Sequence, residues 1–228
     1  MENRPYGDLD MNGVGNAGGG RYRRVCTDGV SKVEGDVQAD EFRANGVTTV
    51  GGSLETETMR ANGKLKIEGK LKAGKADIDG LIDVLGSLTG EEVVLKGILN
   101  IRGDCELERF DASGGFEVGG MLNAGFIDIA LYGHGKAREI GCESIRVRKI
   151  AKSIWKEALQ KMFSKWTPEL QTGTIEGDDL DLEHTVASVV RGNRVVIGPG
   201  CRIGRVEYRS EYRKHPGAQV GKEMKTGE

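Results

Sequence analysis

The sequence predicts an all-β protein, a triangular parallel β-helix with 17-residue coils, into which one amphipathic α-helix is inserted after the seventh coil. Two observations carry this prediction. From Val30 onward the chain divides without a gap into six units of equal length, of which the first ends at Gly46 and the second at Gly63. Glycine accounts for 36 of the 228 residues, about twice its usual share, and recurs at fixed positions of these units.

The repeat is visible in three columns of the aligned units. Position 4 holds a β-branched apolar residue throughout: Val33, Val50, Ile67, Val84, Ile101 and Val118. Position 6 always holds glycine: Gly35, Gly52, Gly69, Gly86, Gly103 and Gly120. Position 17 holds glycine in five of the six units: Gly46, Gly63, Gly80, Gly97 and Gly114. A repeat of this regularity is typical of a solenoid.

Each unit contains three short stretches in which apolar or small residues alternate with polar ones. In the fourth unit, positions 2, 4, 8, 10, 13 and 15 are Ile82, Val84, Leu88, Gly90, Val93 and Leu95. Alternation of period two is typical of a strand with one buried face, so each unit is expected to form three strands. The glycines at positions 6 and 17 fall at two corners, and polar pairs such as Asp40 and Glu41 fall at the third.

Coils of this kind bury their inward side chains only by stacking, about 4.8 Å apart, as parallel strands. Outward side chains at the same position of successive coils then become neighbours. At position 9 this column changes its charge along the stack: Gln38, Glu55, Lys72, Thr89 and Glu106. At position 14, Arg60 is expected beside Asp77. Such neighbours mainly avoid repulsion between like charges.

The repeat resumes in a seventh coil after one extra residue near Tyr132. Positions 8, 10, 13 and 15 of this coil are Ile140, Cys142, Ile145 and Val147. Its start is irregular, because the register of the repeat places His134 and Lys136 at inward positions. The predicted β-helix core is 25–150, with a local distortion at this point.

Residues 151–168 change to a helical period. Trp155, Leu159, Met162, Phe163 and Trp166 share one face of the expected amphipathic helix, lysines occupy the other, and Pro168 follows its end. The candidate contact residues are Trp155, Leu159, Phe163 and Trp166. This face can cap the solenoid, bind a partner or subunit, or lie on a membrane surface.

The remaining segments complete the predicted domain organisation. Residues 169–208 alternate again and suffice for about two more coils, which either extend the same stack or form a separate small sheet. Residues 1–24 and 209–228, rich in glycine or charge, are expected to be disordered tails.

The charge and the lack of targeting features restrict the expected partners. A net charge of −2 gives no overall field that would attract nucleic acid. The sequence has no secretory signal and no long apolar span, so a cytoplasmic location is expected. The inner face of the membrane, reached by peripheral contact, is the alternative location.

No catalytic, cofactor-binding or metal-binding residue is assigned, and the chain is predicted not to be an enzyme. The four cysteines lie far apart, and His134, His184 and His215 form no metal-ligand pattern. The segment 197–204, IGPGCRIG, resembles one unit of a hexapeptide-repeat acyltransferase, in which His134 or His184 would be the general base. This remains a minor alternative, because 17 is not a multiple of six.

The units VEGDVQADEFRANG, KIEGKLKAG and VLGSLTGEEVVLKG resemble the bactofilins, bacterial polymer-forming cytoskeletal proteins, over about residues 30–131. The resemblance implies a right-handed triangular β-helix that assembles end to end into nonpolar filaments without nucleotide. It also implies a scaffold near the cell envelope, whose partners are the protein itself and possibly another cytoskeletal or envelope-associated protein. The additions after the seventh coil depart from the family pattern, and if they cap one end, growth stops at dimers. The alternative is a capped solenoid that acts as an adaptor for a protein partner.

Overall fold

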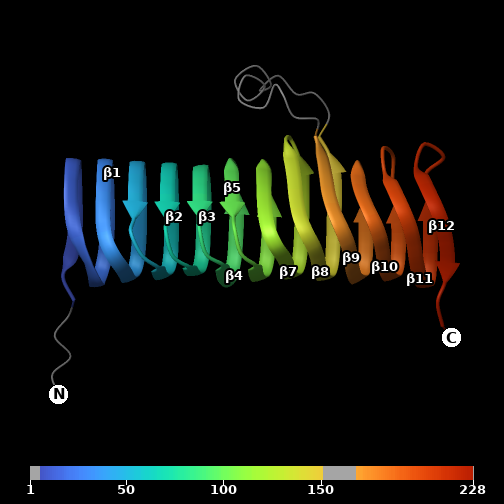
Figure 1. Cartoon of the computed structure of the whole chain (residues 1–228), viewed down its shortest axis with the longest axis horizontal. Coiled ribbons are helices and arrows are strands. Elements are labelled where there is room, and N and C mark those ends of the chain that lie inside the picture. Colours follow the sequence, from blue (N-terminus) through green and yellow to red (C-terminus); the bar gives the residue numbers. More distant parts are fainter. Residues whose placement is uncertain (1–5, 151–167, 228) are drawn as a thin grey trace. The chain divides into compact units, whose positions relative to one another are not determined.

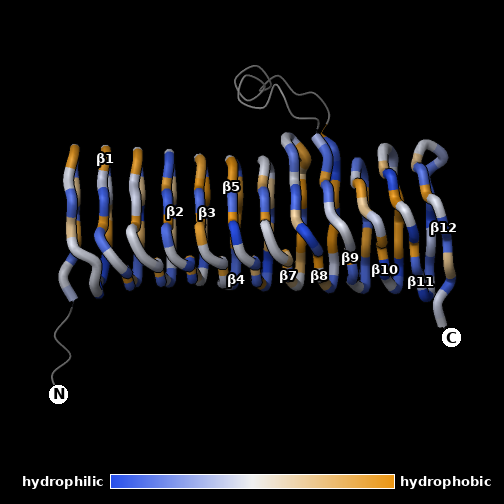
Figure 2. Tube along the Cα trace, in the orientation of Figure 1, coloured by the Kyte–Doolittle hydropathy of each residue, from blue (hydrophilic) through white to orange (hydrophobic). Residues whose placement is uncertain are grey.

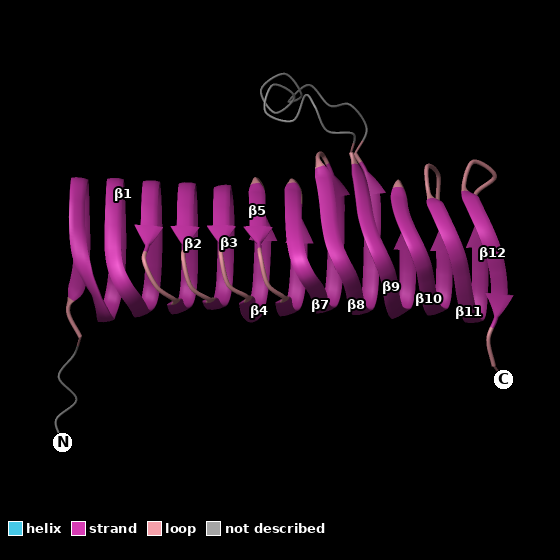
Figure 3. Cartoon of the chain, in the orientation of Figure 1, coloured by secondary structure: helices cyan, strands magenta, loops and turns pink. Residues whose placement is uncertain are grey.

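The structure, a computed structural model, describes residues 6–150 and 168–227. Within these ranges all regular secondary structure is β-strand (Figure 3). These residues therefore contain no helix long and apolar enough to cross a membrane. The chain divides into two compact units, Met1–Glu108 and Arg109–Glu228. Both are parallel β-solenoids with coils of about 17 residues, about ten coils in all. The all-β solenoid and its coil length are therefore confirmed.

The first unit has the regular repeat that the sequence predicts. Its strands are β1 (Asp8–Val50), β2 (Leu54–Ile67), β3 (Leu71–Val84), β4 (Leu88–Leu95), β5 (Ile98–Ile101) and the start of β6 (Cys105–Ala112). β1, β2, β3 and β4 pair in that order, and β5 also pairs with β3, always in parallel. Every pair joins residues one repeat length apart, as in Val37, Leu54, Leu71 and Leu88.

The apolar side chains of each coil point into a narrow continuous core. In the fourth coil Ile82, Val84, Leu88, Val93 and Leu95 are at most 1% exposed, as the alternation predicts. The hydropathy of the chain alternates along the strands accordingly (Figure 2). Each coil therefore covers the core of the next, and burial of these columns is the main stabilising term.

Gly46 and Gly69, one from each glycine column, show why the corners require glycine. Gly46, at position 17, has a φ of 102°, a left-handed conformation that is costly for other residues. Gly69, at position 6, has no such φ, but a Cβ there would lie 2.6 Å from the backbone nitrogen of Ser53 in the preceding coil. Gly46 also approaches the preceding coil, because a Cβ there would lie 2.4 Å from the Gly29 carbonyl oxygen. Gly46 therefore needs both its backbone conformation and its small size, whereas Gly69 needs only its small size.

The second unit is itself a stack of parallel coils, but its coils do not keep the strict 17-residue period. Its strands are β7 (Gly115–Leu131), β8 (His134–Lys149), β9 (Glu169–Leu182), β10 (Thr185–Ile197), β11 (Arg202–Lys214) and β12 (Gln219–Lys225), paired in that order and in parallel (Figure 1). Leu122 pairs with Ile140, eighteen residues later, whereas Ile175 pairs with Val190, fifteen residues later. Bulges and corners of different length absorb the change.

The start of the seventh coil differs from the register that the sequence predicts. His134 and Lys136 do not face the core; Gly135 and Ala137 are the buried residues. The cause is a register shift between Val118 and Met121, which moves the inward positions by one residue. Gly135 then lies against the Phe116 ring, where a Cβ would be only 2.8 Å from a ring carbon.

The segment after residue 168 continues the same stack, which answers a question that spacing left open. β8 pairs with β9 through Ile140 and Ile175, and β10 and β11 follow in order. The amphipathic helix expected over 151–168 falls on residues 151–167, outside the described residues.

The disordered tails expected at 1–24 and 209–228 are wrong for the described parts of these ranges. Asp8 to Arg24 lie in β1, and residues 209–214 and 219–225 lie in β11 and β12. Their low hydrophobicity does not prevent folding, because an adjoining coil supplies a complete ladder of backbone partners. For example, the Arg23 N–H donates to the Gly7 carbonyl at 3.0 Å.

Candidate functional site: the first and last coils

The first coil, residues 6–20, has an incompletely covered core side. Its inward side chains Leu9, Met11 and Ala17 are only half-buried, whereas Val25 and Val33 in the second coil are fully buried. No described strand precedes this coil, so one side of its strand has no ladder partner among the described residues. The coil thus presents apolar side chains beside unpaired backbone groups.

The charges of the first coil are neutralised within the unit. Asp8 and Asp10 are the only charged residues in 6–20. The Arg24 guanidinium lies 3.2 Å from Asp8 and 3.4 Å from Asp10, and Arg23 also pairs with Asp8. Val14 on the same coil is 87% exposed. The surface of the first coil is therefore apolar, glycine-rich and close to neutral.

The last coil consists of residues 208–225, from the end of β11 through β12. It differs from the first coil, because the core columns of the second unit end in polar residues there. One column consists of paired residues that are each at most 1% exposed: Leu122, Ile140, Ile175, Val190 and Val206. The next ladder partner, after Val206, is Glu223. Paired residues of parallel strands point to the same face, so Glu223 stands at a core position.

Two neighbouring core columns end in the same way. Val195 pairs with Tyr212, and Ile197 pairs with Lys214. The Lys214 ammonium lies 2.5 Å from a Glu223 carboxylate oxygen, which lowers the pKa of Glu223. Tyr212 stacks on Tyr208 with ring centroids 5.0 Å apart, and burial together with Glu223 raises the pKa of its hydroxyl. An ion pair and two stacked phenols thus cover the apolar core.

The outer edge of the last coil also carries features that hinder strand pairing. β12 has only 7 residues, and Lys222 and Lys225 project from it. Arg209 and Arg213 lie nearby in β11 and are exposed. Short edge strands, lysines and inward-pointing charges are the devices by which β-proteins prevent edge-to-edge association.

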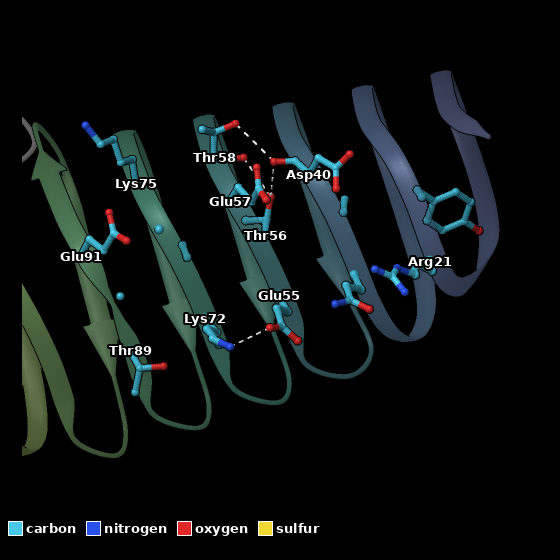
Figure 4. A pocket seen from close by; sticks show the side chains of 16 residues that line it. Arg21, Asp40, Glu55, Thr56, Glu57, Thr58, Lys72, Lys75, Thr89 and Glu91 are labelled. Atoms are coloured by element: carbon cyan, nitrogen blue, oxygen red, sulfur yellow. Dashed lines mark hydrogen bonds and ion pairs between the residues drawn. The ribbon is translucent and has the colours of Figure 1, made fainter. Parts of the chain in front are cut away.

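The first unit also has an open groove of about 730 Å³ along the third corner of its coils (Figure 4). Glu55 and Lys72 form an ion pair of 2.7 Å in it, as the alternating column predicts, and the Thr56 hydroxyl donates to the Asp40 carbonyl at 3.3 Å. Its other charged lining residues are Arg21, Asp40, Glu57, Lys75 and Glu91. The groove therefore offers mixed, solvated charges without a concentration of one sign.

The Arg60 and Asp77 side chains are neighbours, as the repeat predicts. They are Cα partners between β2 and β3, with an N–O distance of 3.7 Å. Both side chains are more than half exposed, so the pair contributes little to stability.

The three histidines lie apart from one another in corners and strand ends. His184 has a φ of 44° and donates its backbone N–H to Pro199 at 2.9 Å, and burial lowers its pKa. Gly200 lies so close to it that a Cβ would meet the His184 ring at 2.5 Å. The hexapeptide-like segment 197–204 is thus the corner between β10 and β11. No group of three or more potential metal ligands occurs among the described residues.

The candidate contact residues Trp155, Leu159, Phe163 and Trp166 lie outside the described residues. The sequence predicts assembly through coil ends and considers a cap after the seventh coil, but it assigns neither role to the residues of the first and last coils, because it places both in disordered tails. A signal for the last coil exists, because Tyr212 and Lys214 follow Val195 and Ile197 at the spacing of the repeat, so extending the repeat finds polar residues in core columns.

Comparison with known proteins gives two relatives in Bacillus subtilis (strain 168). The chain is similar to YhbE and YhbF. It is 40% identical to YhbE over 105 residues and 37% identical to YhbF over 107 residues, and both are described as uncharacterized proteins. Each match covers 46% of this chain and 42% of the relative, so the chain matches less than half the length of either. No protein-family model and no solved structure matches the chain.

Proposed function

We propose that this chain is a non-enzymatic, bactofilin-like structural protein that self-assembles through its coil ends into a scaffold, without nucleotide. The observation that supports the proposal is the incompletely covered core side of the first coil, where Leu9 and Met11 are half-buried beside a strand edge that has no ladder partner within the described residues. In the same proposal the triangular coil is right-handed, and the assembly lies in the cytoplasm, at or near the inner face of the membrane.

Stacking another copy on such a coil repeats the contact that every coil already makes with its neighbours. Each coil of the first unit covers apolar columns and satisfies a parallel ladder, as in the pairing of Leu54 with Leu71. A second copy on the first coil would bury Leu9 and Met11 and supply partners for the edge. The free energy comes from burial and hydrogen bonding, so the reaction requires no nucleotide.

The bactofilin resemblance supports the same function. It rests on the repeated units between residues 30 and 131, and the first unit has their regular pairing from one repeat to the next. When both ends of a solenoid are open, end-to-end contacts generate filaments; when one end is closed, assembly stops at a pair. The chemistry of the last coil is therefore decisive for the size of the assembly.

Sedimentation velocity and negative-stain electron microscopy of the purified chain, over a wide concentration range and without nucleotide, test this function. We expect association that increases with concentration, persists at high salt and is unchanged by added ATP or GTP, because the contact is apolar. Monomers at all concentrations and salt conditions would refute the proposal.

A further inference from the structure

The last coil is unsuited to receive a second copy on its core side. A copy seated there would cover the ion pair of Lys214 and Glu223, whose side chains are now 38% and 39% exposed. Removing two charges from water costs more than their mutual attraction returns unless further hydrogen bonds replace the lost water. The half-buried apolar side chains of the first coil, Leu9 and Met11, cannot provide such bonds.

Two last coils also repel one another. Four of the seven cations in residues 202–225 are paired with carboxylates, whereas Arg209, Lys222 and Lys225 form no ion pair within the described residues. A contact between two last coils therefore brings these like charges together. The first coil offers no charge to compensate for them, because Asp8 and Asp10 already bind Arg23 and Arg24. Both contacts that involve the last coil are therefore disfavoured.

Contact between two first coils meets neither obstacle. The surface of residues 6–20 has no unpaired carboxylate, and its inward side chains are apolar. Such a contact is self-complementary, since the same residues of both copies meet about a two-fold axis. A two-fold contact closes on itself and leaves no free first coil for a third copy.

We propose that the last coil is a built-in cap, formed by Tyr208, Tyr212, Lys214 and Glu223, and that assembly stops at a pair of copies joined first coil to first coil. This inference rests on the proposed function, because it assumes that coil ends are the assembly surfaces. It specifies that the partner is a second copy of this chain and that the last coil limits the size of the assembly.

The decisive variant restores the core columns of the last coil. Lys214→Ile with Glu223→Val places at both positions the residue type found one repeat length earlier, at Ile197 and Val206. Lys222→Ile is the matched control. Lys222 is the ladder partner of the exposed Arg205, so this substitution removes one charge but restores no core column. Sedimentation velocity and electron microscopy of the full chain give the size of each assembly, and circular dichroism verifies the fold.

We expect pairs from the wild-type chain and the Lys222→Ile control, and chains of more than two copies from the double variant. Met11→Lys should weaken the pair on the order of tenfold or more, because it places a charge in the contact. Wild-type filaments would overturn the cap but uphold self-assembly through coil ends. Monomeric wild type at all concentrations would overturn both proposals. A folded double variant that stays a pair would overturn the cap.

A second measurement leaves the cap residues unchanged. Asn12→Cys puts a thiol on the first coil and Gln219→Cys puts one on the last coil, both at exposed positions. Under mild oxidation we expect a disulfide-linked dimer from Asn12→Cys and none from Gln219→Cys. Efficient crosslinking through residue 219 would overturn the inference even if the uncapped variant fails to fold.

Discussion

Ile197 and Lys214 are partners in the parallel ladder between β10 and β11, so an ammonium group stands where the next apolar residue of a core column would be. Ile197 is fully buried, and Lys214 binds Glu223. In the proposal above, this replacement closes the stack at the last coil. The first coil has no such replacement, because its inward side chains Leu9 and Met11 are apolar.

The cap is expected to depend on pH through Glu223. Lys214 lowers the pKa of Glu223 below its ordinary value of 4.5, so the folded state favours the ionised carboxylate. The resulting stability is complete above the ordinary value and is lost as the pH falls through the lowered pKa. Urea unfolding of wild type and Lys214→Met between pH 7 and pH 3 measures the effect. The difference between the two proteins should shrink toward acid; a constant difference would contradict the assignment.

Replacing Gly46 by alanine should destabilise the first unit on the order of 2 kcal/mol or more. The φ of 102° is unfavourable for alanine, and the added Cβ would lie 2.4 Å from the Gly29 carbonyl oxygen. Gly18→Ala is the control, since nothing lies within 4 Å of its Cβ position, and it should change the unfolding free energy by less than about 0.5 kcal/mol. Equal effects of both substitutions in urea unfolding would show that the corner conformation is unimportant.

Phe110 and Phe126 provide a matched test of core burial in the second unit. Phe110 is 1% exposed and makes an edge-to-face contact with Phe116 at 5.3 Å, whereas Phe126 is 52% exposed. Phe110→Ala should cost about 3–5 kcal/mol of unfolding free energy, and Phe126→Ala less than about 1 kcal/mol. An equally costly Phe126→Ala in urea unfolding would contradict the exposed position of that ring.

Three cysteines should resist thiol reagents in the folded chain. Burial raises the pKa of Cys105 and Cys142 to about 12 and that of Cys201 to about 11, so little thiolate exists at pH 8. We expect these three to react with Ellman's reagent only after unfolding by urea. Cys105 and Cys201 are buried, whereas Cys142 is half-buried, as is the comparison residue Cys26, so the resistance of Cys142 rests on its raised pKa. Rapid labelling of Cys105 or Cys201 under native conditions would contradict their burial, and rapid labelling of Cys142 would contradict its raised pKa.

The sequence by itself determined the coil. Gly46 has a left-handed φ and Gly69 lies too close to the preceding coil for a Cβ, and such requirements appear in the sequence as columns of glycine. The apolar alternation of Ile82, Val84 and Leu88 likewise specifies which side faces the core, because side chains of a strand alternate.

Only the tertiary structure decided where this register changes and where the stack is closed. The register shift between Val118 and Met121 places Gly135 instead of His134 at the core. Later coils pair residues at separations other than 17, as for Ile175 and Val190. Spacing alone therefore misplaces the inward residues of the second unit. The terminal coils have too few apolar residues to be recognised as strands, and β1 reaches Asp8 only because the next coil supplies its ladder partners. Whether Glu223 is a tail residue or the last member of a core column depends on its pairing with Val206, a contact that local sequence does not specify.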